Sequence, residues 1–277
     1  MIHLVLVSLI WAFSFGIIGN TLAPVPSPLV SAIRLILAFL LFAPFFKRMA
    51  WRGALFFVFL GGVQFGAMYL CYNESFKHLE SHQVALLTLT TPIFIALLEG
   101  FRARKISARL WLSVWVATLG VGIIVWHPGG FSRLPLLGLL LIQLSNLCFA
   151  FGQWAYRNRV KDAADRPAFS WMYLGAALVA LPFAWQHRQL ATELEARQIF
   201  ALLYLGLVAS GLCFFMWNLG ARRVTAARMA VMNDLKIPLG ILASVLVFKE
   251  SPHFLRLAVG VPLLVAAIWL GGEKQKK

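Results

Sequence analysis

The sequence predicts an all-α integral membrane protein with ten transmembrane helices, arranged as two inverted five-helix repeats. Three observations support this fold class. Of the 277 residues, 61% are hydrophobic and only 13% are charged, and the mean hydropathy of +0.81 is outside the usual range for a soluble domain. Apolar runs of about 20 residues, the length that crosses a bilayer, follow one another along the chain. Finally, spaced glycine and asparagine residues of the first half recur in the second.

The apolar runs define the expected helices and the domain boundaries. The ten expected spans are residues 2–20, 29–46, 52–72, 81–99, 108–126, 135–156, 168–186, 198–219, 225–247 and 253–271. The first span begins beside Met1 without a basic leader or a small-residue cleavage site, so we expect a retained helix and not a removed signal peptide. The predicted units are a first repeat (1–126), a short linker (127–134), a second repeat (135–271) and a basic C-terminal tail (272–277).

The repeat is visible in three separate parts of the chain. Residues 13–16 (Phe-Ser-Phe-Gly) resemble residues 149–152 (Phe-Ala-Phe-Gly), and Pro92 recurs as Pro238. Five spans are an odd number, so the second copy would enter the bilayer in the opposite sense, as in many transporters. The matched positions at an offset of 145 residues are Gly61 with Gly206, Gly66 with Gly211, and Asn73 with Asn218.

The formal charge of +15 would suit nucleic-acid binding, but the placement of the basic residues indicates membrane topology instead. Seventeen Lys and Arg residues lie in one set of alternate loops and the C-terminus, and six lie in the opposite set. The positive-inside rule then places both termini in the cytoplasm and the chain in the cytoplasmic (inner) membrane. The predicted partners are membrane lipids and a small-molecule substrate, without nucleic acid, and a homodimer stays open.

Several other classes of site are not predicted. Cys71, Cys148 and Cys213 lie in apolar spans without paired spacing, and no His-Glu-x-x-His pair occurs, so we expect neither a metal site nor a cofactor. No Gly-x-x-x-x-Gly-Lys-Ser/Thr loop occurs, which argues against ATP hydrolysis. Residues 208–211 and 233–234 only approach intramembrane serine and aspartyl protease motifs, so an enzyme and a receptor or scaffold are minor alternatives.

With these features the chain resembles the drug/metabolite transporter superfamily, in particular its ten-helix members with two EamA-type domains. The resemblance rests on the aromatic, glycine-rich first span, on Arg34 early in the second, on Pro92 after the third-to-fourth hairpin, and on residues 248–250 (Phe-Lys-Glu). Arg104 stands at the position that matches Glu250 in the first half.

That resemblance implies a secondary carrier, mostly of the exporting kind, for amino acids, other small metabolites or drugs. One characterised type exports aromatic amino acids. The function expected is therefore export of an amino acid or similar small metabolite across the cytoplasmic membrane by alternating access. A carrier of lipid-linked or drug-like substrates is the alternative within transport.

Three charged residues lie more than four residues from the ends of the expected spans: Arg34, Asp234 and Lys236. A charge near the bilayer centre costs about 2.5–3.5 kcal/mol on insertion scales, so it normally faces protein or a water-filled path. Asn233 and Lys236 share a helix face, and we expect both to face the substrate, with the Lys236 ammonium holding a carboxylate. Asp234 would serve as a proton carrier or as counter-ion to Arg34 or Lys236. The alternatives are a structural ion pair and, for Arg34, snorkelling to the surface.

A polar stripe marks the sixth span. Gln143, Asn146, Ala150 and Gln153 follow one another at i, i+3, i+7 and i+10 on an otherwise apolar helix. Amides on one face must be satisfied by another helix or by water, so this face is predicted to line a cavity or to form interhelical hydrogen bonds. The other expected substrate-binding residues are Gln64, Trp11, Trp154, Tyr72 and His82.

Two prolines are predicted hinges. Pro92 and Pro238 each remove a backbone hydrogen bond from a span, and the hydroxyls of residues 88–91 could satisfy the freed carbonyls. A static kink is the alternative at either site. Asn73 and Asn218 stand near helix ends, where capping is the expected role, and the matched glycines are expected to permit close helix contact.

Overall fold

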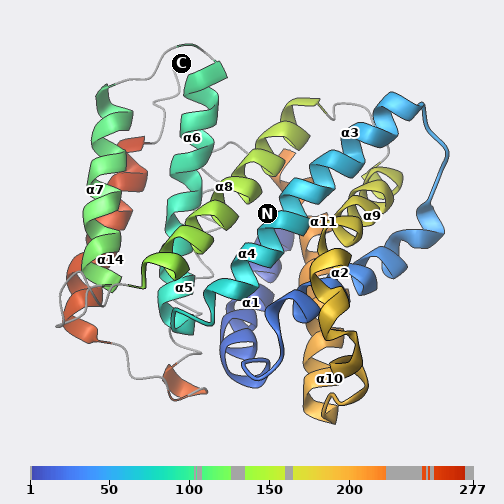
Figure 1. Cartoon of the computed structure of the whole chain (residues 1–277). Coiled ribbons are helices and arrows are strands. Elements are labelled where there is room, and N and C mark those ends of the chain that lie inside the picture. Colours follow the sequence, from blue (N-terminus) through green and yellow to red (C-terminus); the bar gives the residue numbers. More distant parts are fainter. Residues whose placement is uncertain are drawn as a thin grey trace.

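The computed structural model describes residues 2–102, 104, 108–125, 135–159, 165–222, 245–247, 249 and 253–271, and within these ranges the protein is a bundle of helices without strands (Figure 1). Continuous helical segments cover nine of the expected spans, and nearly all of the ninth (225–247) lies outside the described residues. The α-helices are α1 (Ile2–Gly16), α2 (Ser27–Phe42), α3 (Trp51–Gly61), α4 (Met68–Ser75), α5 (Ser81–Leu87), α6 (Thr91–Arg102), α7 (Ala108–Val125), α8 (Leu136–Arg159), α9 (Asp165–Ala184), α10 (Ala196–Leu203), α11 (Cys213–Arg222) and α14 (Phe254–Gly271).

Several spans contain short segments with a different helical pitch. Two adjoining elements therefore form one span wherever a π-helix or 3₁₀-helix joins them, as in α3–η3–α4 and α10–η7–α11. The π-helices are η1 (Ile17–Thr21), η3 (Gly62–Ala67) and η7 (Tyr204–Leu212), and the 3₁₀-helices are η2 (Ala43–Phe45), η4 (Thr88–Thr90) and η6 (Trp185–Thr192). π-helical turns are rare and are frequently found at functional sites.

Local sequence explains where several spans begin. Pro28 stands in the first turn of α2, where its missing N–H has no intrahelical partner to lose. Capping boxes close the N-termini of α5 and α10: Glu80 pairs with Gln83, and Glu195 pairs with Gln198. These polar caps lie at the ends of apolar helices, where free N–H groups would otherwise meet the membrane interface.

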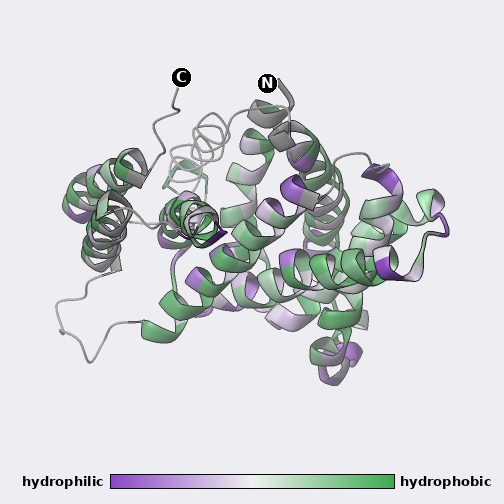
Figure 2. Cartoon of the chain, turned by 90° about the horizontal axis from the view of Figure 1, so that it is seen from above, coloured by the Kyte–Doolittle hydropathy of each residue, from purple (hydrophilic) through white to green (hydrophobic). Residues whose placement is uncertain are grey.

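The outer surface has the character of a membrane protein. Six helices in the described part of the chain are long and apolar enough to cross a bilayer: Ser27–Phe45, Trp51–Ser75, Ser81–Arg102, Leu136–Asn158, Asp165–Thr192 and Ala196–Gly220. Large apolar side chains such as Leu40, Phe59 and Leu144 are exposed on them. Most of the bundle is hydrophobic, and the strongly hydrophilic residues gather at helix ends and loops (Figure 2).

The helices pack in a pattern that relates the two halves. α2 packs against α9, and α7 packs against α14 at one side of the bundle (Figure 1). α3 and η3 pack on α9, whereas η7 packs on α2. Gly138 of α8 lies against His78 and Leu79, and Gly152 lies against Gln64, so α8 runs antiparallel to the α3–α4 span.

The glycines matched in the sequence make these contacts reciprocal. A Cβ at Gly61 would overlap the backbone of Met172 in α9, and a Cβ at Gly206 would meet Leu37 and approach the backbone of Arg34 in α2. The second pair behaves in the same way: Gly66 lies against Ala176 and Val179, and Gly211 against Ala38 and Leu41. The glycines are offset by 145 residues and their partners by 138. Such reciprocity is what a two-fold relation between the halves would produce, and opposite insertion of the halves stays a prediction.

The backbone carries a further sign of the repeat. Arg104 and Lys249 are the two non-glycine residues with positive φ in the described ranges, at 52° and 55°, and they too are 145 residues apart. Left-handed backbone is uncommon for side chains of this kind. The matched geometry pairs Arg104 with Lys249. The sequence comparison of the two halves had instead paired Arg104 with the next residue, Glu250.

We expect Gly61→Ala to destabilise the protein, because the new methyl would overlap the Met172 backbone and force α3 away from α9. Overpacking of this kind costs about 1–3 kcal/mol. Thermal unfolding in detergent measures it, and Gly122→Ala is the matched control because a Cβ there meets nothing within 4 Å. An unchanged Tm for Gly61→Ala would contradict the close packing described here.

Candidate functional site

A cavity of about 540 Å³, including its open mouth, lies between the helices at the centre of the bundle. The wall is formed by α1, α2, α4, α8 and α11 and by the break between α5 and α6. Its aromatic members are Trp11, Phe15, Tyr69, Tyr72, Phe149 and Phe214, and its polar members are Ser14, Arg34, Thr88, Thr91, Ser145 and Asn146.

Arg34 of α2 lies in this wall and is only 2% exposed. Its Nε donates a hydrogen bond to Oγ of Ser210 (3.2 Å), and its Nη1 donates to Oδ1 of Asn73 (3.1 Å). The guanidinium carbon lies 4.1 Å from the ring centroid of Tyr69, which adds a cation–π contact. These two bonds use two of the five N–H donors of the guanidinium, and no carboxylate within the described ranges pairs with Arg34. The guanidinium therefore keeps unused donors at the pocket.

The partners of Arg34 are themselves held in place. Asn73 donates through Nδ2 to Oγ of Ser31 (2.8 Å), and Ser31 donates to the backbone of α2 and α4. Oγ of Ser210 donates to the hydroxyl of Tyr69 (2.9 Å), and the hydroxyl of Tyr173 in α9 donates to the Ser210 carbonyl. We call Arg34, Ser31, Tyr69, Asn73 and Ser210 the arginine network. It joins α2, α4 and η7 beside the pocket.

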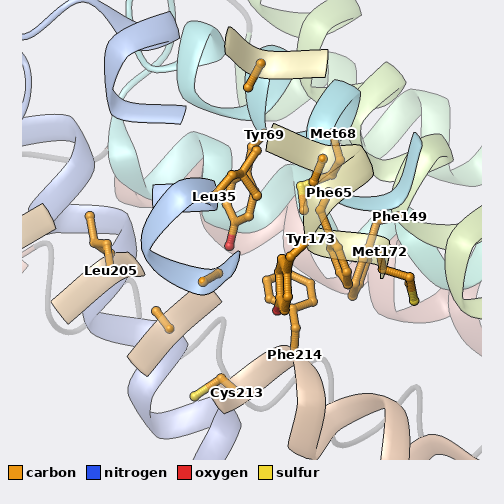
Figure 3. Close-up of a cluster of buried hydrophobic side chains, with 14 of the residues drawn as sticks. Leu35, Phe65, Met68, Tyr69, Phe149, Met172, Tyr173, Leu205, Cys213 and Phe214 are labelled. Carbon is orange, nitrogen blue, oxygen red and sulfur yellow. The ribbon is translucent and has the colours of Figure 1, made fainter. Parts of the chain in front are cut away.

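Aromatic side chains form the apolar side of the site. The Trp11 ring lies 4.8 Å from the Phe214 ring and 6.3 Å from the Phe149 ring, and its Nε1 donates to the Ala209 carbonyl (2.9 Å). Behind this layer Phe65 stacks on Tyr173 at 4.9 Å and 18°. Figure 3 shows the rings of Phe65, Phe149, Tyr173 and Phe214, from η3, α8, α9 and α11, in one cluster. The rings offer a rigid, flat surface to a ligand.

α8 supplies the second polar wall. Nδ2 of Asn146 donates to the Leu87 carbonyl (2.9 Å) and to Oγ1 of Thr90 (3.0 Å). Because a carbonyl only accepts, this contact fixes the orientation of the amide and leaves Oδ1 as an acceptor without a partner among the described residues. Gln143 lies outside the pocket wall, and its Oε1 is 2.7 Å from Oγ1 of Thr90, the hydroxyl that Asn146 also contacts.

The fourth span is broken beside the pocket. α5 ends at Leu87, the 3₁₀ turn η4 follows, and Pro92 is the second residue of α6. The hydroxyls of Thr88 and Thr90 donate to the carbonyls of Ala85 (2.7 Å) and Leu87 (3.0 Å), so they satisfy part of the interrupted backbone. The break places Thr88 and Thr91 in the pocket wall.

Outside the spans, Lys77 and Glu74 fix the loop that precedes α2 to the end of α4. Lys77 donates to the carbonyls of Ala23 and Val25, and Glu74 accepts from Oγ of Ser27. Burial lowers the pKa of the Lys77 ammonium, and the neighbouring Glu74 carboxylate partly opposes this shift. The loop therefore holds the N-terminus of α2, and with it the helix that carries Arg34.

The structure brings together a part of the predicted site. Trp11, Arg34, Tyr72 and Asn146 line the pocket, and Gln143 supports it through Thr90. Arg34 is buried and hydrogen-bonded and does not snorkel to the surface. Its partner Asn73 belongs to this network, whereas within the described ranges the Asn218 side chain bonds to the Phe214 carbonyl of its own helix (2.9 Å).

Other predicted residues lie elsewhere. Gln64, Gln153 and Trp154 are absent from the pocket wall, and all three have buried polar atoms without a partner among the described residues. His82 is buried at the start of α5, where its Nδ1 lies 3.2 Å from Oε2 of Glu80. Asn233, Asp234, Lys236 and Pro238 fall in the ninth span, outside the described residues, so their roles stay predictions.

Sequence reasoning gave no pocket role to Ser210 or to Phe214. A signal for Phe214 was present, because it stands 145 residues after Tyr69, the offset that relates the matched glycines. Ser210 offered no such signal. Its position is 176 residues from Arg34 in the chain, and only the folded bundle brings the two side chains together.

A model described as the EamA-like transporter family matches residues 1–126 and 136–272. The chain belongs to the EamA-like transporter family. A probable biotin transporter of Pseudomonas aeruginosa is 37% identical over 98% of this chain and 96% of its own length. Biotin transporters of Salmonella typhimurium and Escherichia coli (strain K12) are each 33% identical over 98% of this chain and 92% of theirs.

A solved crystal structure supports the fold alone. It is 17% identical and covers 96% of this chain and 94% of its own, with a TM-score of 0.67. The family match confirms the predicted place of this EamA-like protein in the drug/metabolite transporter superfamily. It is a multi-pass transporter of the bacterial inner membrane that carries a small molecule, from a family of transporters and not of enzymes.

We expect Asn73→Leu to destabilise this EamA-like protein more than Asn218→Leu does, although both asparagines are 2% exposed. Leu at 73 removes an acceptor of the buried Arg34 guanidinium, and hydrogen bonds to charged groups contribute about 1.5–3 kcal/mol. Among the described residues, Leu at 218 removes a bond within its own helix. Thermal unfolding in detergent compares the two variants. Equal Tm values would mean that Asn73 does not hold the guanidinium.

Proposed function

We propose that this protein carries biotin or a closely similar small carboxylate across the inner membrane, with Arg34 binding the carboxylate. The observation that supports this most is the buried guanidinium at the pocket, which has unused donors and no carboxylate partner within the described ranges. Charge-assisted hydrogen bonds to a carboxylate are among the strongest that a site can form. The names of the relatives favour biotin as the carboxylate.

The pocket offers partners for each part of biotin. The molecule has a carboxylate on an aliphatic chain, a sulfur-containing ring and a ureido group with N–H donors. Arg34 would hold the carboxylate, and the rings of Trp11, Phe149 and Phe214 would cover the chain and the ring system. The free Oδ1 of Asn146 would accept from a ureido N–H.

An amino acid, the substrate class expected from the sequence, is the second candidate. Its carboxylate would suit Arg34 equally well. Its ammonium group would also need a negative partner in the apolar pocket, and the described part of the wall carries no carboxylate. Biotin has no cationic group and therefore meets no such requirement.

For the mechanism we propose alternating access between two inverted repeats. The break at η4 would act as the hinge, because it interrupts the fourth span directly at the pocket wall. Asp234 in the ninth span would serve the same pathway as a proton carrier or counter-ion. Lys236 in that span would be a second cation beside the cargo. Pro238 would be the matching hinge.

We expect purified protein in proteoliposomes to take up labelled biotin, and Arg34→Gln to weaken binding at least tenfold, a loss of about 1.4 kcal/mol or more. Arg34→Lys should recover only a part, because an ammonium lacks the planar fork of a guanidinium. Arg188→Gln is the matched control, since Arg188 is exposed in η6. Binding of biotin by Arg34→Gln at parental affinity would exclude Arg34 as the anchor.

The same prediction has a test without mutation. Unlabelled dethiobiotin, which keeps the carboxylate and the ureido group, should compete with biotin in the parent protein. Biotin methyl ester, which has lost the negative charge, should compete at least tenfold less well. Equal competition by the ester would contradict carboxylate recognition, and stronger competition by amino acids than by dethiobiotin would favour the second candidate.

A further inference from the structure

Three buried polar atoms without partners gather where α8 crosses the span α3–η3–α4. Gln64 in η3 has 0% exposure, and both its Oε1 and its Nε2 lack a hydrogen-bond partner among the described residues. Gln153 on α8 is 5% exposed, and its Nε2 also lacks a partner. Buried polar groups in proteins are almost always paired, so unpaired amides at one helix crossing need an explanation.

The two glutamines lie one helical turn from the pocket, in the same direction. Met68 lines the pocket from α4, and Gln64 precedes it by four residues. Phe149 lines the pocket from α8, and Gln153 follows it by four residues. Because α8 runs antiparallel to the α3–α4 span, both steps lead toward the end of the bundle where α3 begins and α8 ends, a distance of roughly 5–6 Å.

The packing at this level is close and specific. Gly152 directly precedes Gln153, and a Cβ at residue 152 would overlap the side-chain carbons of Gln64. The Gln64 side chain therefore lies flat on the backbone of α8. Gln64 also belongs to the π-helix η3, a local widening of the helix that is often retained at functional sites.

We propose that Gln64 and Gln153 form a second binding station on the transport path, one turn below the Arg34 pocket, for an amide or ureido group. Gln64 offers an acceptor, Oε1, and a donor group, Nε2, and Gln153 offers a second donor group, Nε2. A ligand group with both N–H and C=O could pair with all of them. In the conformation described here, the station is closed by the contact of Gln64 with Gly152. Separation of α8 from the α3–α4 span would open it. The identity of the cargo at this station rests on the proposed function.

The test compares binding with transport in Gln64→Leu and Gln153→Leu. Leucine removes the unpaired amides, so the Tm in detergent should stay equal or rise, and the Kd for biotin should stay within about twofold because the Arg34 pocket is intact. The uptake rate in proteoliposomes should fall at least tenfold, and Gln64→Asn, which keeps an amide, should recover part of it. Gln186→Leu, at an exposed site in η6, is the control. Uptake at the parental rate, or a Kd that weakens as much as the rate falls, would overturn the proposal.

A second measurement does not depend on the identity of the cargo. Gln64→Cys is made in a chain whose native Cys71, Cys148 and Cys213 are replaced by alanine, and a charged methanethiosulfonate reagent is added to the reconstituted protein. The reagent should modify the new thiol, since the station opens to water during transport. Ala180→Cys, at a fully buried site in α9, should stay unmodified. Lack of reaction at position 64 would overturn the proposed second site, even if biotin uptake is confirmed. Reaction at position 64 without biotin uptake would support the second site and reject biotin as its cargo.

Discussion

A buried guanidinium is the constraint on which the centre of this structure depends. Arg34 lies in a bundle whose surroundings are apolar, where a charge costs several kcal/mol unless it is solvated by protein groups. Ser210 and Asn73 accept from it and Tyr69 covers it, and each of these side chains is fixed by a further bond. Solvating this one charge therefore holds α2, α4 and η7 together at the pocket.

The two halves share their packing but not their chemistry. The reciprocal glycine contacts place Met172 where the first half has Arg34, and the 145-residue offset places Phe214 where the first half has Tyr69. Met172 is fully buried in the apolar cluster, and Phe214 forms part of the aromatic wall of the pocket. The first repeat thus supplies the charge and one of its acceptors, Asn73, and the second supplies the other acceptor, Ser210, together with apolar side chains at the positions equivalent to Arg34 and Tyr69. A single site with one charged and one apolar side results from a duplicated scaffold.

The sequence predicted the spans well because hydrophobic length is a local property. It also pointed to Trp11, Arg34, Tyr72 and Asn146, whose polarity or symmetry stands out in an apolar helix. Sequence reasoning could not pair Arg34 with Ser210, because that contact depends on how two distant spans cross. It did not foresee the π-helices η3 and η7 either, which interrupt spans whose apolar pattern is continuous.

The balance of charge connects the site to the transport cycle. The charges predicted away from the ends of the spans are Arg34, Asp234 and Lys236, and they sum to one positive charge. With a carboxylate cargo bound, as proposed here, that sum becomes zero, and the loaded carrier avoids the cost of an unbalanced charge in a medium of low dielectric constant. The empty carrier retains the positive charge and must solvate it within the protein. The arginine network meets this need, which explains why the guanidinium is held by neutral acceptors and an aromatic ring: these groups stabilise the charge without neutralising it, so an anionic cargo can still bind.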